Sequence, residues 1–209
     1  MNQLGNGLSA ADHDEDALTV GEAELSMRRR VGDSESNILA MQLNLAITYS
    51  DLGRYEQALR LKRDAYSGRV KLNGEEHEDT LAAAFNYASS LIYNDRFEEA
   101  RSLLRRTVPM ARRVLGEGNR LLLMMRWKYG EAICRADGAA LDEVRESVNM
   151  LEETARTARR VLGGANPTAA QIEHCLRCGR ATLCARETGD MSDVNALCEK
   201  VGAMKMRDG

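Results

Sequence analysis

The chain has 209 residues, of which 4% are aromatic and two are proline, while Ala, Leu, Glu and Arg are abundant; this composition favours helices over sheets. Its 29 basic and 32 acidic residues give a formal net charge of −3, which excludes a general affinity for nucleic acid or acidic membranes. No charge-free run is long enough to cross a bilayer, and five cysteines, an odd number, indicate reduced thiols in the cytoplasm.

The N-terminal segment, residues 1–13, is rich in Gly, Ala and Asp, and we expect it to be disordered. It lacks the basic start and apolar stretch of a secretory signal. A leading helix is predicted over residues 14–31, and the repeat domain is placed at residues 14–206.

From residue 32 onward the sequence repeats with a period of 42 residues. Gly32, Gly74 and Gly116 are 42 residues apart, and so are Asn44 and Asn86. Each unit is interpreted as a helical hairpin, with repeats at about residues 34–73, 76–115, 118–162 and 167–206. The predicted fold is all-α: a right-handed superhelical solenoid of antiparallel helix hairpins, with about nine helices.

In the first repeat we expect helices over Ser34–Leu52 and from about Tyr55 to Lys71. Gly53 lies between them and suits the left-handed residue that ends many helices. At the next boundary, Asp79 or Thr80 is predicted to cap the following helix.

One hexapeptide marks the ends of two repeats. The segment Ala111–Gly116 recurs letter for letter as Ala158–Gly163, and each copy contains an arginine pair. These pairs fall in a last helical turn, where positive charge complements the helix dipole, so we assign them no binding role. Pro167 follows at the predicted start of the next helix, where its missing N–H costs nothing.

The pattern Asn-Leu-Ala-x-x-Tyr-x-x-x-Gly-x-Tyr-x-x-Ala over residues 44–58, with the boundary sequence of residues 72–81, resembles the 42-residue tetratricopeptide repeats of kinesin light chains. The resemblance spans about residues 24–186 and is strongest in the first two repeats. The boundary departs from the family pattern by the inserted Asn73 and by Glu78 in the usual place of Pro. Many unrelated proteins share this repeat, and no N-terminal heptad coiled coil is evident, so motor association is not implied.

The resemblance implies that the first helix of each hairpin lines a concave groove for an extended peptide. The groove candidates are Asn44, Ile47, Asn86, Ser89, Tyr93, Trp127, Lys128 and Arg135. The two asparagine amides suit a peptide backbone because an amide both donates and accepts hydrogen bonds; the alternative is a bond to a neighbouring helix.

In the third repeat, Lys128 with Arg135 predicts a cationic groove end for an acidic ligand segment; the alternative is a solvated pair offset by Glu131. Trp127 is either a binding anchor or part of the core.

The cysteine-rich stretch His174–Cys184 is interpreted as small buried helix residues rather than a metal site, because zinc needs four ligands held by a defined turn. We therefore predict no metal and no cofactor. The glycines fall at turns and boundaries, and no nucleophile, histidine and carboxylate share a context, so no enzymatic activity is predicted.

Together these patterns predict a scaffold or adaptor that binds a protein or peptide, with no nucleic-acid or membrane partner. The alternative is a regulatory repeat domain of a larger signalling ATPase or enzyme. The last repeat has a degraded packing signature and no clear capping helix, which predicts weak self-association through Cys198, Val201 and Met204.

Overall fold

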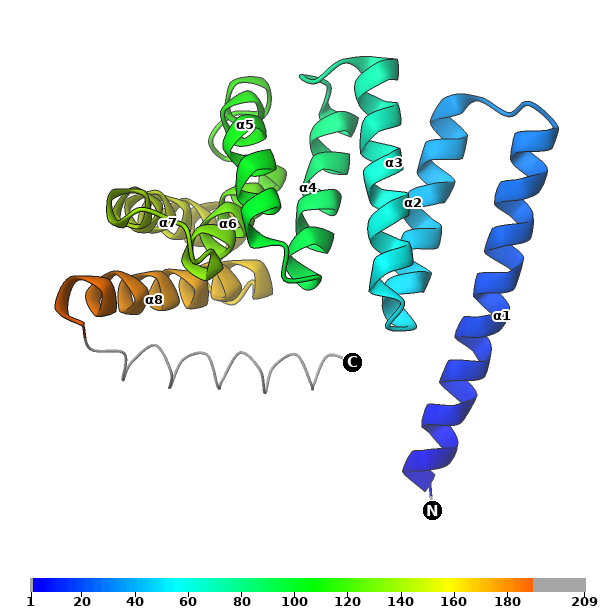
Figure 1. Ribbon diagram of the computed structural model, residues 1–209, viewed down its shortest axis with the longest axis horizontal. Coiled ribbons are helices and arrows are strands. Elements are labelled where there is room, and N and C mark those ends of the chain that lie inside the picture. Colours follow the sequence, from blue (N-terminus) through cyan, green and yellow to red (C-terminus); the bar gives the residue numbers. More distant parts are fainter. Residues whose placement is uncertain (1, 190–209) are drawn as a thin grey trace. The chain divides into compact units, whose positions relative to one another are not determined.

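The computed structural model describes residues 2–189, and of residues 2–14 only the helical backbone. These residues form eight α-helices and no strand (Figure 1). The expected second helix of the fourth hairpin, and the self-association residues Cys198, Val201 and Met204, lie outside the described part. In residues 2–189 no helix is both long and apolar enough to span a membrane.

The chain divides into two compact units, residues 1–94 and 95–209. The first unit contains α1 (Asn2–Arg30), α2 (Glu35–Asp51), α3 (Tyr55–Asn73) and α4 (Glu78–Tyr93). Within it α1 packs on α2, α2 on α3 and α3 on α4. The leading helix begins at Asn2, whereas the sequence placed its start near residue 14.

The second unit contains α5 (Phe97–Leu115), α6 (Arg120–Arg135), α7 (Leu141–Leu162) and α8 (Pro167–Thr188). Consecutive helices pack on each other, and α6 also packs on α8. The first helices of successive hairpins therefore share an interface in this unit. The all-α hairpin class predicted from the 42-residue period is confirmed.

Alanines at the helix contacts of the first unit explain how its helices approach closely. Ala46 of α2 and Ala58 and Ala65 of α3 are completely buried. Leu18 and Leu25 of α1 form one core cluster with Leu45, so the leading helix covers the apolar side of α2.

In the first two hairpins, the turn between the two helices contains a residue with positive φ. Gly53 has φ +70°, and Asp95, at the equivalent position of the next repeat, has φ +57°. Asp tolerates this left-handed conformation better than most residues, which accounts for the exchange of Gly for Asp without loss of the turn.

The first helix of each described hairpin begins with a side-chain cap. Ser34 Oγ accepts from Asn37 N at 3.3 Å, and the side-chain oxygens of Asn119 and Asn166 accept from Leu121 N at 2.7 Å and Thr168 N at 2.9 Å. Pro167 occupies the first turn of α8, as predicted.

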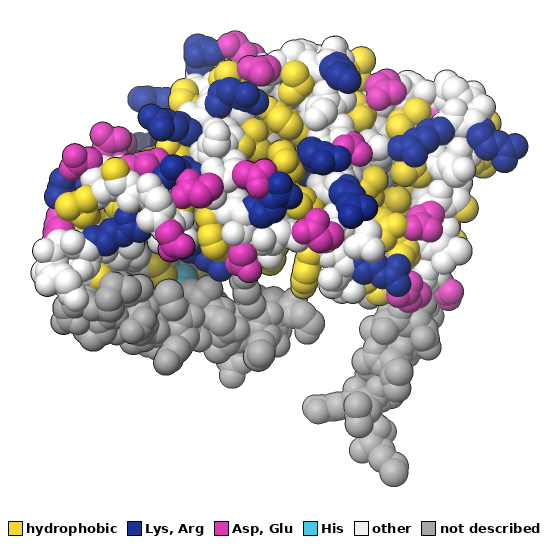
Figure 2. Space-filling model, viewed as in Figure 1, with side chains coloured by type: hydrophobic (Ala, Val, Ile, Leu, Met, Phe, Trp, Pro, Cys, Tyr) yellow, Lys and Arg dark blue, Asp and Glu magenta, His cyan; other side chains and the backbone are white. Residues whose placement is uncertain are grey.

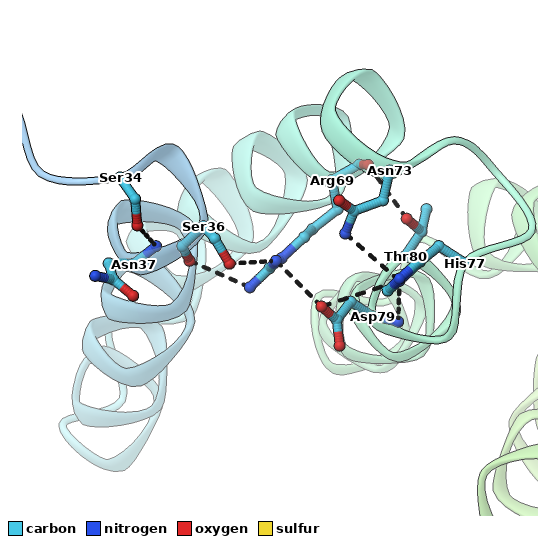
Figure 3. A network of polar contacts seen from close by, with 8 residues as sticks. All are labelled: Ser34, Ser36, Asn37, Arg69, Asn73, His77, Asp79 and Thr80. Carbon is cyan, nitrogen blue, oxygen red and sulfur yellow. Dashed lines mark hydrogen bonds and ion pairs between the residues drawn. The ribbon is translucent and has the colours of Figure 1, made fainter.

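The cap of α4 differs from the prediction. It is His77, whose Nδ1 accepts from Asp79 N at 3.2 Å. Asp79 and Thr80 do not cap the helix because both side chains are engaged with Arg69 of α3 (Figure 3).

Arg69 joins three helices of the first unit. Its side chain is 9% exposed, and Nη1 donates to Ser36 Oγ of α2 at 2.9 Å and to Asp79 Oδ2 of α4 at 3.2 Å. Nη2 donates to Ser36 O at 3.2 Å, and the buried Thr80 hydroxyl donates to Arg69 O at 3.2 Å (Figure 3). A buried guanidinium is tolerated here because both of its terminal nitrogens have hydrogen-bond partners.

Candidate functional site

The candidate residues of the first unit lie on α2 and α4. Asn44 is exposed beside a hollow between α1 and α2, which Val20, Met41 and Thr48 also line. Asn86, on α4, is half-buried. In the described part of the chain, neither side-chain amide makes a hydrogen bond, so the helix-bridging alternative is not observed.

Exposed apolar side chains accompany the two amides on the same helices. Ile47 of α2 is 56% exposed and Tyr93 of α4 is 54% exposed. The Tyr93 ring stacks on Tyr55, with centroids 6.2 Å apart and planes within 8°. A stacked tyrosine has a restricted orientation, so it loses less entropy when a ligand covers it.

Ser89 is positioned differently from the other candidates. Its Oγ is buried and has no hydrogen-bond partner among the described residues. A ligand on the surface of α4 would not reach this oxygen without a movement of the helix surface.

The candidates of the second unit lie on α6. Trp127 is half-buried and packs on the core cluster that contains Leu123, Leu151 and Ile172, so its ring contributes to packing. Lys128 Nζ lies 4.2 Å from the centroid of this ring.

Both cations on α6 have acidic partners. Lys128 Nζ is 2.9 Å from Glu131 Oε2, and the lysine side chain is only 12% exposed. Arg135 lies 3.2 Å from Asp95 Oδ1, 3.5 Å from Glu131 Oε1 and 4.3 Å from the centre of the Phe97 ring. The positive charge predicted for this end of the groove is thus largely compensated within the unit.

Cys134 of α6 and Cys175 of α8 are protonated thiols. Burial raises the pKa of Cys134 to about 12 and raises that of Cys175 well above its ordinary value. Cys178 Sγ lies 3.6 Å from His174 Nε2, and burial, with a contribution from Arg177, lowers the pKa of this histidine. No group of three His, Cys, Asp or Glu side chains within the described region could hold a metal ion.

The sequence interpretation missed one feature, a hollow between α7 and α8. Five arginines and two glutamates line it, with Ala155 and Leu176 as its apolar residues. Two of the arginines, Arg159 and Arg160, belong to the pair explained above by the helix dipole alone. The signal in the sequence was a second pair of arginines, Arg177 and Arg180, on the following helix. The repeat period alone does not show that these arginines lie opposite those of α7.

Charge is mixed over the rest of the visible surface. On the face drawn in Figure 2, basic and acidic side chains are interspersed with apolar ones. With the net charge of −3, this pattern is unlike the continuous basic surface of a nucleic-acid-binding domain.

Comparison with known proteins identifies the repeat type. Residues 37–113 match the tetratricopeptide repeat family, so this segment consists of tetratricopeptide repeats, as the sequence predicted. No curated protein matches the chain.

Solved structures share the fold over most of the chain. A variant of a putative kinesin light chain from Podosopora anserina, with nearly identical TPR-like repeats, has a TM-score of 0.70 at 21% identity and covers 99% of this chain and 93% of its own. BtubC (BKLC) from P. vanneervenii has a TM-score of 0.67 at 14% identity, over 93% of this chain and 74% of its own. The fold is therefore of the type found in kinesin light chain-like tetratricopeptide proteins.

Proposed function

We propose that this chain is a non-catalytic scaffold of the cytoplasm that binds an extended peptide segment of a partner protein along α2 and α4. The observation that carries the proposal is the pair of equivalent amides, Asn44 and Asn86, neither of which is hydrogen-bonded in the described region. Asn is a poor residue in the middle of a helix, so two such residues one repeat apart need a reason other than helix stability.

The chemistry of this face suits a peptide backbone. An amide donates to a backbone carbonyl and accepts from a backbone N–H, and each would pair with one peptide unit. The exposed side chains of Ile47 and Tyr93 provide apolar contacts for the ligand side chains between those units.

Trp127, Lys128 and Arg135 contribute less in this proposal. Glu131 already pairs with both cations, and an acidic ligand would have to compete with it. Ser89 contributes only if its buried hydroxyl becomes accessible.

The test compares Asn44→Ala, Asn86→Ala and the double variant. The intact chain serves as bait in a pull-down, and affinities for the recovered partner are measured by isothermal titration calorimetry. Each lost hydrogen bond should cost about 0.5–1.5 kcal/mol of binding free energy, and the two losses should roughly add because the sites are separate.

The matched control is Asn37→Ala, on the same helix as Asn44. The Asn37 amide is exposed and donates to Asp33 Oδ1 at 2.8 Å, so it is already paired. Its loss should leave affinity unchanged. Unchanged affinity in the double variant would reject the groove role, and a lower melting temperature with unchanged affinity would show that both amides are structural.

A further inference from the structure

The hollow between α7 and α8 carries a concentrated positive charge. Its lining comprises five arginines and two glutamates, a net charge of +3, in a chain whose net charge is −3. All the lining residues belong to the second unit. The hollow is thus a local exception to the charge balance of the chain.

Both glutamates are neutralised by two of the arginines. Arg159 Nη2 lies 2.5 Å from Glu173 Oε1, and Arg180 Nη2 lies 2.6 Å from Glu152 Oε1. Each pair bridges α7 and α8 and fixes one helix against the other. The pairs leave the remaining three guanidinium groups without a carboxylate.

Those three groups are Arg156, Arg160 and Arg177, and all three side chains are exposed. Arg156 Nε donates only to a backbone carbonyl, Glu152 O, at 3.4 Å. Arg177 meets only His174 Nδ1, at 3.5 Å, and Arg160 has no polar partner in the described part of the chain. Three like charges around one hollow repel one another, and an anion placed between them would relieve that repulsion.

The equivalent position in the preceding repeat lacks this arrangement. In both copies of the hexapeptide the first arginine has a glutamate partner, Glu117 for Arg112 and Glu173 for Arg159. The difference lies around them, because the residues 47 positions before Arg156 and Arg177 are Pro109 and Gly130. The helix dipole therefore accounts for the arginine pair in both repeats, but it does not account for the three unpaired guanidinium groups around the second copy.

We propose that this hollow binds a phosphorylated serine or threonine in a segment of a partner protein. A guanidinium group donates two parallel hydrogen bonds to a phosphoryl group, and a phosphate near −2 is best matched by several arginines converging on one place. Ala155 and Leu176, each less than 10% exposed, give the hollow an apolar base for a neighbouring ligand side chain. The proposal uses no residue of the Asn44 and Asn86 face, so either proposal can fail without the other.

The test uses the full chain and three fluorescein-labelled degenerate peptide pools. The pools are identical except for a fixed central residue, which is phosphoserine, serine or glutamate. In fluorescence anisotropy we expect the phosphoserine pool to bind at least about tenfold more tightly than the other two, with affinity falling as salt increases. Arg160→Gln and Arg177→Gln should each weaken binding of the phosphoserine pool about fivefold or more.

Arg113→Gln is the matched control, since Arg113 is the counterpart of Arg160 in the copied hexapeptide. It should leave binding unchanged, as should the double alanine variant of Asn44 and Asn86. Melting temperatures check that the exposed substitutions leave the fold intact.

Three results would overturn the proposal. The first is equal binding of the serine or glutamate pool. The second is an equal loss of binding in Arg113→Gln. The third is binding of phosphatidylserine vesicles that depends on Arg160 and Arg177 while the phosphoserine pool does not bind.

Discussion

Gly130 occupies the position that Ala46 and Ala88 hold in the two preceding repeats. Both alanines are completely buried, and the repeat pattern alone would favour Ala at residue 130 as well. A Cβ at Gly130 would lie 2.6 Å from Leu151 Cδ1 and within 2.9 Å of two further atoms of that side chain. Leu151 is itself completely buried, so it has little room to move.

Gly130→Ala should therefore destabilise the protein, against the repeat consensus. Overpacking typically costs about 1–3 kcal/mol, as much as or more than the roughly 1 kcal/mol of helix propensity that Ala restores. Urea denaturation should show a lower free energy of unfolding. Gly179→Ala is the comparison: there the nearest atoms to the added Cβ are at 3.3 Å, so its loss should be smaller. A Gly130→Ala variant more stable than the parent would show that Leu151 can repack.

Single side chains also limit how much of the site the sequence predicts. The choice of Asn44 and Asn86 rested on their spacing in the sequence, and their role in a groove stays a prediction. For Lys128 the sequence does indicate the acidic partner, because Glu131 follows three residues later on the same helix. It does not indicate the contact between the lysine ammonium and the Trp127 ring, because that contact depends on the side-chain rotamers. Rotamers and burial are set by neighbouring helices, which a single repeat pattern does not specify.

At the scale of the helix, α5 is unusual because it contains Pro109 in its interior. A proline there has no N–H to donate to the carbonyl of Arg105, and its ring crowds that carbonyl. Pro109 is exposed, so no core contact compensates for the lost hydrogen bond.

Pro109→Ala should raise the stability of α5. The interior penalty of proline is about 3 kcal/mol in model helices, although a helix that has already adjusted to the ring would recover only part of it. Thermal unfolding followed by circular dichroism should show a higher melting temperature. Pro167→Ala provides the contrast, because that proline is in the first turn of α8 and should change stability little. A lower melting temperature in Pro109→Ala would mean that α5 needs the proline for its shape.

The ends of the helices were more predictable at some positions than at others. Ser34 and Asn166 cap α2 and α8 where the sequence indicated helix starts, because both side chains are short and adjacent to the helix. The cap of α4 was misassigned to Asp79 or Thr80. A local pattern could not anticipate that Arg69, ten residues before Asp79, engages both side chains and leaves His77 as the cap.

For the whole molecule, the 42-residue period was sufficient to predict the hairpin architecture, because each hairpin buries its apolar face on the next. The start of α1 at Asn2 was not predicted, since the Gly-rich composition of the first residues argued against a helix. The α7 and α8 hollow was also missed. The hollow depends on how α7 and α8 are aligned against each other. The 42-residue period does not predict this alignment, because the step from Gly116 to Gly163 is 47 residues.

The division into two compact units predicts a local response to a local change. In repeat arrays, stability is a sum of terms within a repeat and between neighbours, so a destabilising substitution acts mainly nearby. In Gly130→Ala, hydrogen exchange measured by mass spectrometry should accelerate in α6, α7 and α8 and change little in α2 and α3. Equal acceleration in all these helices would instead indicate that residues 2–189 unfold as a single cooperative unit.

The end of α3 also bears on how the protein ages in storage. Asn73 is followed by Gly74, and in a flexible chain such a pair deamidates readily because the glycine nitrogen attacks the asparagine side chain to close a succinimide ring. Here the Gly74 N–H donates to Val70 O at 3.0 Å, and the residue is held at φ +83°. The folded chain thus keeps this nitrogen from reacting, and the reaction proceeds only when α3 opens. Isoaspartate at residue 73 would accordingly accumulate as a chemical record of the time that the C-terminal end of α3 has spent open.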